Sequence, residues 1–365
     1  MTNQAAQNGL IVILICLISI FPISAEAAQK REKILLDTDM VEAFDDGIAM
    51  LMLAKSPNIQ LLGVTTVTGN TWAKEGAAYG LRQLEAIGME KEVPLVIGEE
   101  YPTRKGRIEN MKQERIEFGR GYDDYTGAAM RPNPASWRDV YKKAYGEEPK
   151  SAPLEKDAAD FIIEQVRKYP GEVTIVAVGP CTNIAKAIQR APEIVPLVKR
   201  IIYMGGAFFV PGNVTPAAEF NWWFDPESAK AALRAPFKEQ TIVPLDPCVK
   251  VRLTPARYRE VSAVVKNPKL AEMMRRQYKN YFGDGRDPDT YFIWDALTAL
   301  ALIDPTVVTE SVALPVDVND TYSLSYGESL AFKGIPPIGA QKAKIILSID
   351  EPRAWKMLLE ACGMF

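Results

Sequence analysis

The chain has 365 residues, of which 47% are hydrophobic and 24% charged, a composition typical of a globular protein with one large or two medium domains. The formal net charge of -3 argues against nucleic acid as the main partner, because binding to phosphates needs a basic surface. The sequence contains no histidine, which excludes histidine-dependent catalytic triads and histidine metal ligands.

Residues 10–22 form an almost wholly apolar run, which is too short for a comfortable membrane span but has the length of a signal-peptide core. Ala25 and Ala27 place small residues at the -3 and -1 positions of a cleavage site. We therefore expect residues 1–27 to be a signal peptide and residues 28–365 to be exported, periplasmic or secreted, without stable membrane insertion after processing. An uncleaved anchor is the alternative, because no Lys or Arg precedes the apolar run.

Short apolar runs alternate with helical patterns along the rest of the chain, which is typical of βαβ units around a parallel sheet. The predicted fold class is therefore α/β. We expect strands at 33–37, 60–67, 94–97, 173–178, 199–204 and 240–245, with late strands at 314–318 and 343–349. We expect helices at 46–55, 73–88, 154–169, 181–190, 226–234, 268–281 and 292–303, with a closing helix at 352–362.

Residues 99–150 interrupt this alternation and are rich in Gly, Pro, Arg and aromatic residues. Long segments without regular structure inside a domain are usually functional or mobile. A lid over a site and a decorated surface insertion with one helix near 137–145 both fit this composition.

An acidic cluster follows the first predicted strand, where Asp37, Asp39, Asp45 and Asp46 occur within ten residues. In open α/β sheets, ligands bind beyond the carboxyl ends of the strands. Crowded carboxylates repel one another unless a cation or a bound proton intervenes, and carboxylate oxygens are what hard cations such as Ca²⁺ prefer. The pattern favours a cation site, and the simpler alternative is a helix N-terminus capped by Asp45 and Asp46.

Two later segments place polar groups at strand ends. Asn70 follows the second predicted strand, where its amide could reach a ligand hydroxyl or serve only in a turn. The strand at 173–178 ends in Gly179 and Pro180, so the carbonyl of Val178 could point at a cation or belong to an ordinary strand-to-helix turn.

Two further segments carry candidate binding groups. Asn213, Glu219 and Asn221 supply the paired donors and acceptors that recognition of a polyol requires. Asp295 follows Trp294 in an otherwise apolar helical pattern. A buried aspartate needs a partner or a metal, and the alternative role for Asp295 is an N-cap.

Together and in this order, these segments resemble the nucleoside hydrolase family, the inosine–uridine-preferring nucleoside ribohydrolases, from about Lys33 to the chain end. The resemblance implies a single domain with a mainly parallel, Rossmann-like sheet flanked by helices and the site at the strand C-termini. It also implies a homodimer or homotetramer, Ca²⁺ as cofactor, and hydrolysis of the N-glycosidic bond of a small-molecule ribonucleoside.

The resemblance also implies a role for each matching residue. Asp39 corresponds to the catalytic carboxylate that binds Ca²⁺ and activates water, and Asp37 corresponds to a supporting aspartate. The further Ca²⁺ ligands correspond to Asp46, the Val178 carbonyl and Asp295. The substrate-binding positions correspond to Asp45, Asn70, Asn213, Glu219, Asn221 and Trp294.

Two departures from the family pattern bear on the site. Five residues, Met40 to Phe44, separate Asp39 from Asp45, where the family usually has fewer, and this leaves open whether Glu42 faces the site. Trp294 stands where a histidine often precedes the aspartate, which resembles the purine-preferring branch and predicts a preference for purine nucleosides. Candidates for the opposite face of the base are Trp137, Tyr122 and Tyr125.

Two rival functions are compatible with parts of the sequence. Residues 34–41 also fit the start of a haloacid-dehalogenase-like phosphatase, but the acidic pair of that family comes late in the chain. A non-catalytic Ca²⁺-dependent riboside-binding protein would use the same groups as a hydrolase, so the sequence leaves this alternative open.

Overall fold

The computed structural model describes Met1 and residues 31–43, 45–119, 125–283 and 291–365, so the expected signal peptide at 1–27 lies outside the described residues. Residues Arg31–Phe365 form one unit. Within the described ranges, no helix combines the length and the apolar character that crossing a membrane requires.

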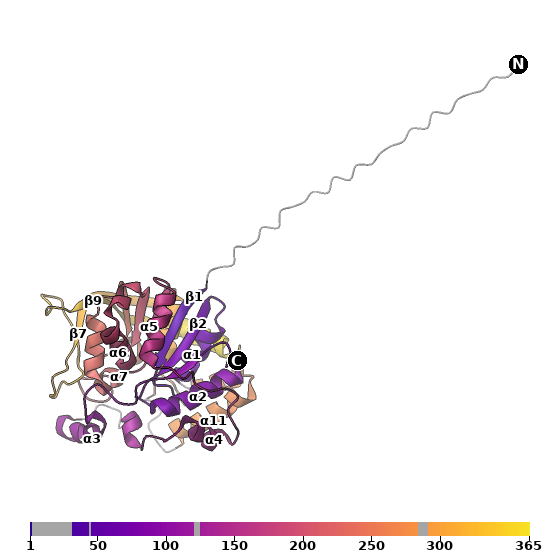
Figure 1. The fold of residues 1–365 in the computed structure, drawn as a ribbon, viewed down its shortest axis with the longest axis horizontal. Helices are drawn as coiled ribbons and strands as arrows, with labels where there is room; N and C mark the ends of the chain where they lie inside the picture. Colours follow the sequence, from indigo (N-terminus) through magenta and orange to yellow (C-terminus); the bar gives the residue numbers. More distant parts are fainter. Residues whose placement is uncertain (2–30, 44, 120–124, 284–290) are drawn as a thin grey trace. The chain divides into compact units, whose positions relative to one another are not determined.

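A nine-stranded sheet runs through the described part of the chain in the order β3-β2-β1-β4-β5-β6-β9-β7-β8 (Figure 1). Neighbours from β3 to β9 pair in parallel, whereas β7 is antiparallel to both β9 and β8. Because β2 and β4 flank β1 on opposite sides, the switch point of the topology lies where β1 and β4 end. The strands are β1 (Glu32–Thr38), β2 (Ile59–Thr66), β3 (Leu95–Ile97), β4 (Val173–Ala177), β5 (Arg200–Met204), β6 (Gln240–Val243), β7 (Val308–Val318), β8 (Ser329–Ala331) and β9 (Gln341–Ile349).

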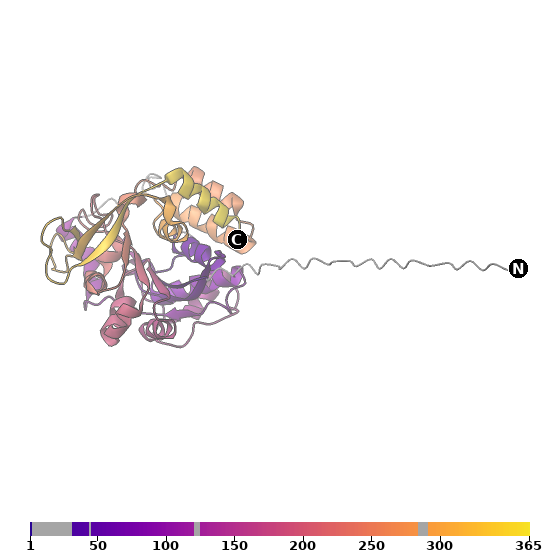
Figure 2. The ribbon, with the colours of Figure 1, turned by 90° about the horizontal axis from the view of Figure 1, so that it is seen from above.

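Helices cover both faces of the sheet and enclose two separate apolar cores. Seen from above in Figure 2, the orange and yellow helices of the C-terminal part lie on one side of the sheet and the pink helices of the middle part on the other. The central strands β1 and β4 are therefore buried on both faces and read as nearly continuous apolar runs. The helices are α1 (Asp46–Lys55), α2 (Ala73–Ala86), α3 (Arg107–Phe118), α4 (Trp137–Tyr145), α5 (Ala158–Lys168), α6 (Thr182–Arg190), α7 (Phe220–Phe224), α8 (Pro226–Arg234), α9 (Leu245–Cys248), α10 (Pro255–Val264), α11 (Pro268–Phe282), α12 (Asp295–Ile303) and α13 (Glu351–Cys362).

The α/β class and the mainly parallel sheet are confirmed, and the boundaries of most predicted elements agree within a few residues. The prediction of a strand up to residue 245 is wrong, because β6 ends at Val243 and α9 begins at Leu245. The late strand is longer than expected, since β7 begins at Val308. The helix expected from 292 begins only at Asp295, because Phe292 forms a β-bridge with Arg252.

Residues 99–150 contain more regular structure than the sequence indicated. The expected helix near 137–145 is confirmed as α4, but α3 was not predicted. The reason is that α3 buries charge rather than an apolar stripe: Arg107 and Glu114 form a fully buried ion pair. Figure 1 places α3 and α4 along the same edge of the molecule as α2 and α11. Whether this segment acts as a lid stays a prediction.

Candidate active site

The site is assembled by backbone pairing that continues past the ends of the central strands. The carbonyl of Asp37 accepts the N–H of Val178 at 2.8 Å, and the carbonyl of Thr38 accepts the N–H of Val67 at 2.9 Å. Three loops, which follow β1, β2 and β4, are therefore drawn together around Asp39. This location is the switch point at which an open α/β sheet binds its ligands.

Asp37 stabilises this arrangement through side-chain hydrogen bonds. Its Oδ1 accepts hydrogen bonds from the Thr65 hydroxyl and from Asn183 Nδ2, which links β1 to β2 and α6. Burial raises the pKa of Asp37 to about 6. The supporting role that the resemblance implied for Asp37 agrees with these contacts. Thr65 and Asn183 both lie in segments that the sequence had marked, but their pairing with Asp37 has no local signal.

Asp39 is completely buried, and its two carboxylate oxygens differ in environment. Oδ2 accepts the backbone N–H of Asn70 at 2.6 Å, whereas Oδ1 has no hydrogen-bond partner among the described residues. The loops approach so closely that a Cβ at Gly69 would lie 2.3 Å from Asp39 Oδ2, and one at Gly179 would lie 2.7 Å from the Asp39 nitrogen. Glycine at both positions is therefore required by space.

Asp46 faces Asp39 from the first turn of α1. Its Oδ1 accepts the Thr38 hydroxyl, and its Oδ2 has no partner in the described part of the chain. Burial and the neighbouring charge of Asp46 raise the pKa of Asp39 well above its usual range. Two like charges therefore share a dry space, which is costly without a proton or a cation.

Asp45 spans a long distance in sequence to reach α12. Its carboxylate accepts the backbone N–H groups of Trp294, Asp295 and Ala296 at 2.9, 2.8 and 3.0 Å. These donors are among the unpaired amides that begin a helix, so Asp45 caps α12 although it lies next to α1, where its side chain caps nothing. Burial raises the pKa of Asp45 to about 7. The substrate-binding role expected for Asp45 stays a prediction, because both of its oxygens already accept hydrogen bonds.

Asp295 joins the acidic cluster through this cap. Its carboxyl is buried, and burial together with the charges of Asp45, Asp46 and Asp39 raises its pKa well above the usual range. The tertiary structure thus brings Asp295 beside the acidic residues that follow β1, as the sequence predicted.

The segment between β5 and α7, which carries Asn213 and Glu219, is held in place largely by its own predicted binding residues. Glu219 accepts the N–H groups of Gly206, Asn221 and Trp222 at 2.9, 2.7 and 3.2 Å, and burial raises its pKa to about 7. Asn213 Oδ1 accepts the N–H of Phe220 at 2.9 Å. Both residues are buried, and their contacts hold the loop in one conformation. Their ribose-binding roles stay predictions.

Asn221 connects this loop to the end of β4. Its Nδ2 donates to the carbonyls of Val178 and Met204 at 3.0 and 3.1 Å, while its Oδ1 is buried without a partner among the described residues. The Val178 carbonyl therefore already accepts one hydrogen bond, and its second lone pair is the one a cation would use.

The chemistry of this donor set fits a hard cation. Asp39 Oδ1, Asp46 Oδ2 and Asn221 Oδ1 are buried oxygens without partners in the described ranges, and such oxygens are the ligands that Ca²⁺ prefers. The same ranges contain no group of three or more acidic or cysteine side chains placed closely enough to hold a metal ion by themselves. The fit therefore rests on the unpaired oxygens, and the cation itself is a proposal.

Trp294 stands at the edge of the cluster, immediately before α12. Its ring is half-buried and lies 6.0 Å from the ring of Phe292 at 71°, and its Nε1 has no acceptor among the described residues. A half-buried aromatic ring with a free donor beside a polar cluster is suited to contact a flat ligand.

Two of the residues between Asp39 and Asp45 contact the helices α11 and α2. Glu42 is buried and forms an ion pair with Arg276 of α11, which answers the question of where its carboxylate points. Ala43 adopts a left-handed conformation, with φ of 62°, and Gln83 Oε1 accepts its N–H at 3.0 Å. Gln83 was not singled out in the sequence, because it lies within an ordinary helix pattern.

Tyr125, Trp137 and Tyr122 are the three aromatic residues expected to contact the opposite face of the base. The hydroxyl of Tyr125 donates to the Asn70 carbonyl at 2.9 Å, which places this residue near the site. Trp137 packs against the apolar core that contains the buried residues of α1. Tyr122 lies outside the described residues.

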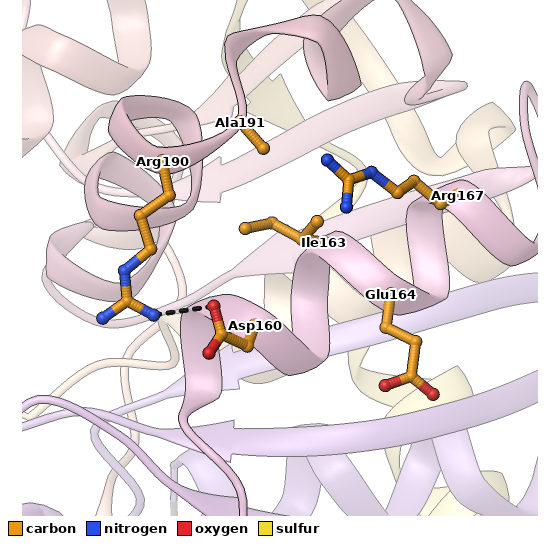
Figure 3. Close-up of a pocket in the computed structure, with 6 residues that line it drawn as sticks. All are labelled: Asp160, Ile163, Glu164, Arg167, Arg190 and Ala191. Carbon is orange, nitrogen blue, oxygen red and sulfur yellow. Dashed lines mark hydrogen bonds and ion pairs between the residues drawn. The ribbon is translucent and has the colours of Figure 1, made fainter.

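A separate surface pocket lies between α5 and the end of α6, and none of the predicted site residues lines it (Figure 3). Its charged groups are paired: Arg190 donates to Asp160 at 2.7 Å, Arg167 pairs with Glu193, and Glu164 pairs with Lys156. These ion pairs neutralise its charges, so the acidic cluster is the stronger candidate site.

Comparisons with known proteins identify the family of the chain. A family model described as inosine-uridine preferring nucleoside hydrolase matches residues 34–356. The chain is 31% identical over 329 residues to uridine nucleosidase 1 of Arabidopsis thaliana, covering 88% of this chain and 90% of that protein. It is also similar to the solved plant nucleoside hydrolase PpNRh1, with a TM-score of 0.73 and 25% identity over 91% of this chain and 99% of that one. A purine-preferring ribonucleoside hydrolase from Gardnerella vaginalis has the same fold, with a TM-score of 0.73 and 24% identity over 91% and 98% of the two chains.

Proposed function

The chain belongs to the inosine-uridine preferring nucleoside hydrolase family, whose members cleave the N-glycosidic bonds of nucleosides, and we propose that it hydrolyses purine ribonucleosides to free base and ribose with Ca²⁺ as cofactor. The observation that carries this proposal is the buried Oδ1 of Asp39, which lies at the switch point of the sheet and has no hydrogen-bond partner among the described residues. A buried carboxylate oxygen without a hydrogen-bond donor is available to take a proton from water.

The proposed Ca²⁺ would be held by Asp39, Asp46, Asp295 and the Val178 carbonyl. When bound, it supplies positive charge that balances these carboxylates, orients sugar hydroxyls and lowers the pKa of a bound water. Elemental analysis of the purified protein should find about one Ca²⁺ per chain. Absence of metal together with full activity after chelation would contradict the proposal.

The residues of the chain divide the remaining work. Asp39 accepts the proton of the attacking water, while the Asn70 N–H fixes the orientation of its carboxylate. Glycoside cleavage passes through an oxocarbenium-like state, and the buried carboxylates of the cluster stabilise its positive charge. In this proposal Asn70, Asn213, Glu219 and Asn221 bind the ribose hydroxyls, together with Asp45.

The proposed preference for purines rests on Trp294. Trp294 directly precedes Asp295 in the sequence, so in this proposal the base of a ribonucleoside bound at the cluster projects toward its ring. A purine offers a larger stacking face than a pyrimidine. Stacking contributes only about 0.5–1.5 kcal/mol per pair beyond buried area, so leaving-group activation also needs a proton donor. The chain has no histidine for this task. Trp294 Nε1, which has no acceptor among the described residues, would donate a hydrogen bond to a water or a base nitrogen, and the proton itself would come from solvent.

Uridine is the second candidate substrate, because the Arabidopsis relative is a uridine nucleosidase. The test is ribose release from inosine, adenosine, guanosine, uridine and cytidine, each with and without a chelator. We expect purine nucleosides to be hydrolysed faster. Faster hydrolysis of uridine would contradict the purine preference and leave the hydrolase assignment intact.

The role of Trp294 can be separated from simple packing with an activated aryl riboside, whose leaving group needs no protonation. Trp294→Ala should lower turnover of purine nucleosides more than turnover of the aryl riboside. Equal losses on both substrates would show that Trp294 only packs the site.

We also propose export and self-association. Export rests on the apolar run at 10–22 and the small residues before Ala28, and N-terminal sequencing should recover Ala28. Recovery of Met1 or Thr2 from a cytosolic protein would contradict export. The family resemblance is the support for self-association as a homodimer or homotetramer, and a monomer in sedimentation analysis at micromolar concentration would contradict it.

A further inference from the structure

We propose that residues Tyr125–Arg131 form a clamp that positions Asp39 through the Gly69–Asn70 turn, with Tyr125 and Arg131 as its positioning residues. This inference rests on the proposed function, since it assigns a role in the reaction to part of the 99–150 segment.

The clamp fixes both peptide groups of Asn70. The carbonyl of Gly69 accepts the N–H of Ala128 at 2.8 Å, and the N–H of the same peptide group donates to Asp39 Oδ2 at 2.6 Å. This one peptide group therefore joins the clamp directly to the proposed general base. Hydrogen bonds in such a chain polarise and strengthen one another in a dry environment.

The next peptide group is held by side chains. The carbonyl of Asn70 accepts the Tyr125 hydroxyl at 2.9 Å and Arg131 Nη2 at 3.2 Å. With both flanking peptides held, the Asn70 N–H has little freedom to turn away from Asp39.

Arg131 is itself held in place by the start of α2. Its Nε lies 3.0 Å from both carboxylate oxygens of Glu75, and its backbone carbonyl accepts Trp72 Nε1 at 2.9 Å. Glu75 also accepts the N–H of Trp72, so one buried carboxylate caps α2 and orients the guanidinium. A guanidinium fixed in this way positions its remaining N–H groups, which a flexible ammonium would not do.

Gly127 shows how tightly the clamp is seated. Its φ is +56°, and a Cβ there would lie 2.2 Å from the Gly69 carbonyl oxygen and 2.7 Å from Phe220 Cζ. The ring of Tyr125 also lies 5.8 Å from the ring of Phe220. The clamp therefore contacts both the Asn70 turn and the start of α7, where Glu219 and Asn221 lie, and a side chain at residue 127 must displace one of them.

Two glycines that both have a positive φ give a matched test. Gly146, at the C-terminus of α4, has φ of +69°, and a Cβ at this position would meet no atom within 4 Å, so Gly146→Ala adds backbone strain alone. Gly127→Ala adds similar strain and pushes on the Gly69 carbonyl. We expect Gly146→Ala to keep the parental kcat and Gly127→Ala to lower kcat at least about tenfold, both assayed below their melting temperatures. Equal kcat values in the two variants would overturn the proposal.

Milder variants separate positioning from folding. Tyr125→Phe removes only the hydroxyl, and loss of one neutral hydrogen bond should lower kcat about fivefold while KM changes less than twofold, because Asp39 acts on the water. Arg131→Gln removes a charge-assisted contact and should lower kcat about 10- to 100-fold. The control is Arg138→Gln, which breaks an exposed ion pair with Glu148 in the same segment and should leave kcat unchanged.

The outcomes distinguish this inference from the function on which it rests. Parental kcat in both Tyr125→Phe and Arg131→Gln, on an active parent, overturns the clamp alone. A change in melting temperature without a change in kcat would show a purely structural role and overturn it as well. No ribose release by the parent overturns the proposed function and the clamp with it.

Discussion

Replacing Asp39 by Asn should stabilise the protein in the absence of Ca²⁺ and reduce the stabilisation that Ca²⁺ provides. The substitution keeps the size of the side chain and removes one of two neighbouring buried charges. Without a cation, the carboxylates of Asp39 and Asp46 repel each other, so the variant should be the more stable protein. With Ca²⁺ present, the parent should gain more stability, because it keeps the full set of anionic ligands.

The size of the effect can be bounded with Coulomb's law for two adjacent carboxylates. Two unit charges about 4 Å apart interact by ~4 kcal/mol at an effective dielectric constant of ~20, which sets an upper limit. One carboxyl can keep its proton when no cation is bound, which lowers the expected gain of the chelated variant to roughly 1–3 kcal/mol. In a unit that spans Arg31–Phe365, stability changes of this size shift the melting temperature by roughly 1–2 °C per kcal/mol, because the entropy of unfolding grows with chain length. Excess Ca²⁺ at about 100 times its dissociation constant should stabilise the parent by ~2.7 kcal/mol.

The pH dependence of the stability difference between the variant and the parent tests the same reasoning. Burial and the Asp46 charge raise the pKa of Asp39 well above its ordinary value. A carboxyl whose pKa rises on folding contributes stability that is present below the ordinary pKa and is lost as the pH rises through the raised one. The advantage of chelated Asp39→Asn should therefore be larger at pH 8 than at pH 5.

The assay is thermal unfolding of the parent, Asp39→Asn and the exposed control Asp139→Asn, in chelator and in millimolar Ca²⁺, at both pH values. A chelated Asp39→Asn protein that melts below the chelated parent at pH 8 would refute the reasoning. Equal stabilisation of both proteins by Ca²⁺ would refute the assignment of Asp39 as a ligand.

Three further predictions concern single residues. Turnover by Asp39→Asn should fall ~10²–10⁴-fold, because the general base is lost, and steady-state rates within tenfold of the parent would remove Asp39 from that role. Asp45→Ala leaves three buried N–H groups of α12 unpaired and should cost roughly 2–4 kcal/mol in urea unfolding, more than Asp350→Ala at the start of α13, and equal losses would contradict a capping role. Burial raises the pKa of Glu219 from 4.5 to about 7, so in chelator the stability of the parent relative to Glu219→Gln should fall as the pH rises from 4.5 to 7 and then level off. A flat difference would show that the three N–H groups keep this carboxylate charged.

The positions of the site segments could be predicted because each lies beside a strong local pattern. Asp37 and Asp39 follow the buried strand β1, and Val178 follows β4, so the rule that parallel strands bind ligands at their carboxyl ends was enough to group them. Asn70 was located in the same way, from the end of β2. Local hydrophobic periodicity reports burial, and burial of a strand on both faces is a property that a short stretch of sequence carries.

The partner of each polar group was a different matter. Asp45 lies next to α1 in the sequence, where the simpler interpretation placed a helix cap. Its carboxylate instead caps α12, where it accepts the N–H of Asp295, 250 residues further along the chain. Glu42 pairs with Arg276, 234 residues distant. Charged residues at such separations have no spacing rule, because their meeting depends on how whole helices pack.

The sequence by itself determined the α/β class, the order of the strands along the chain and the chemical types gathered at their ends, because these follow from local periodicity and from the direction of parallel strands. Only the tertiary structure decided which oxygens have no partner within the described ranges, as at Asp39 and Asp46, and which accept backbone N–H groups, as at Asp45 and Glu219. It also decided that the Tyr125–Arg131 segment reaches the Asn70 turn. These outcomes depend on contacts between elements far apart in the chain, and their free energy is set by burial that no single element possesses alone.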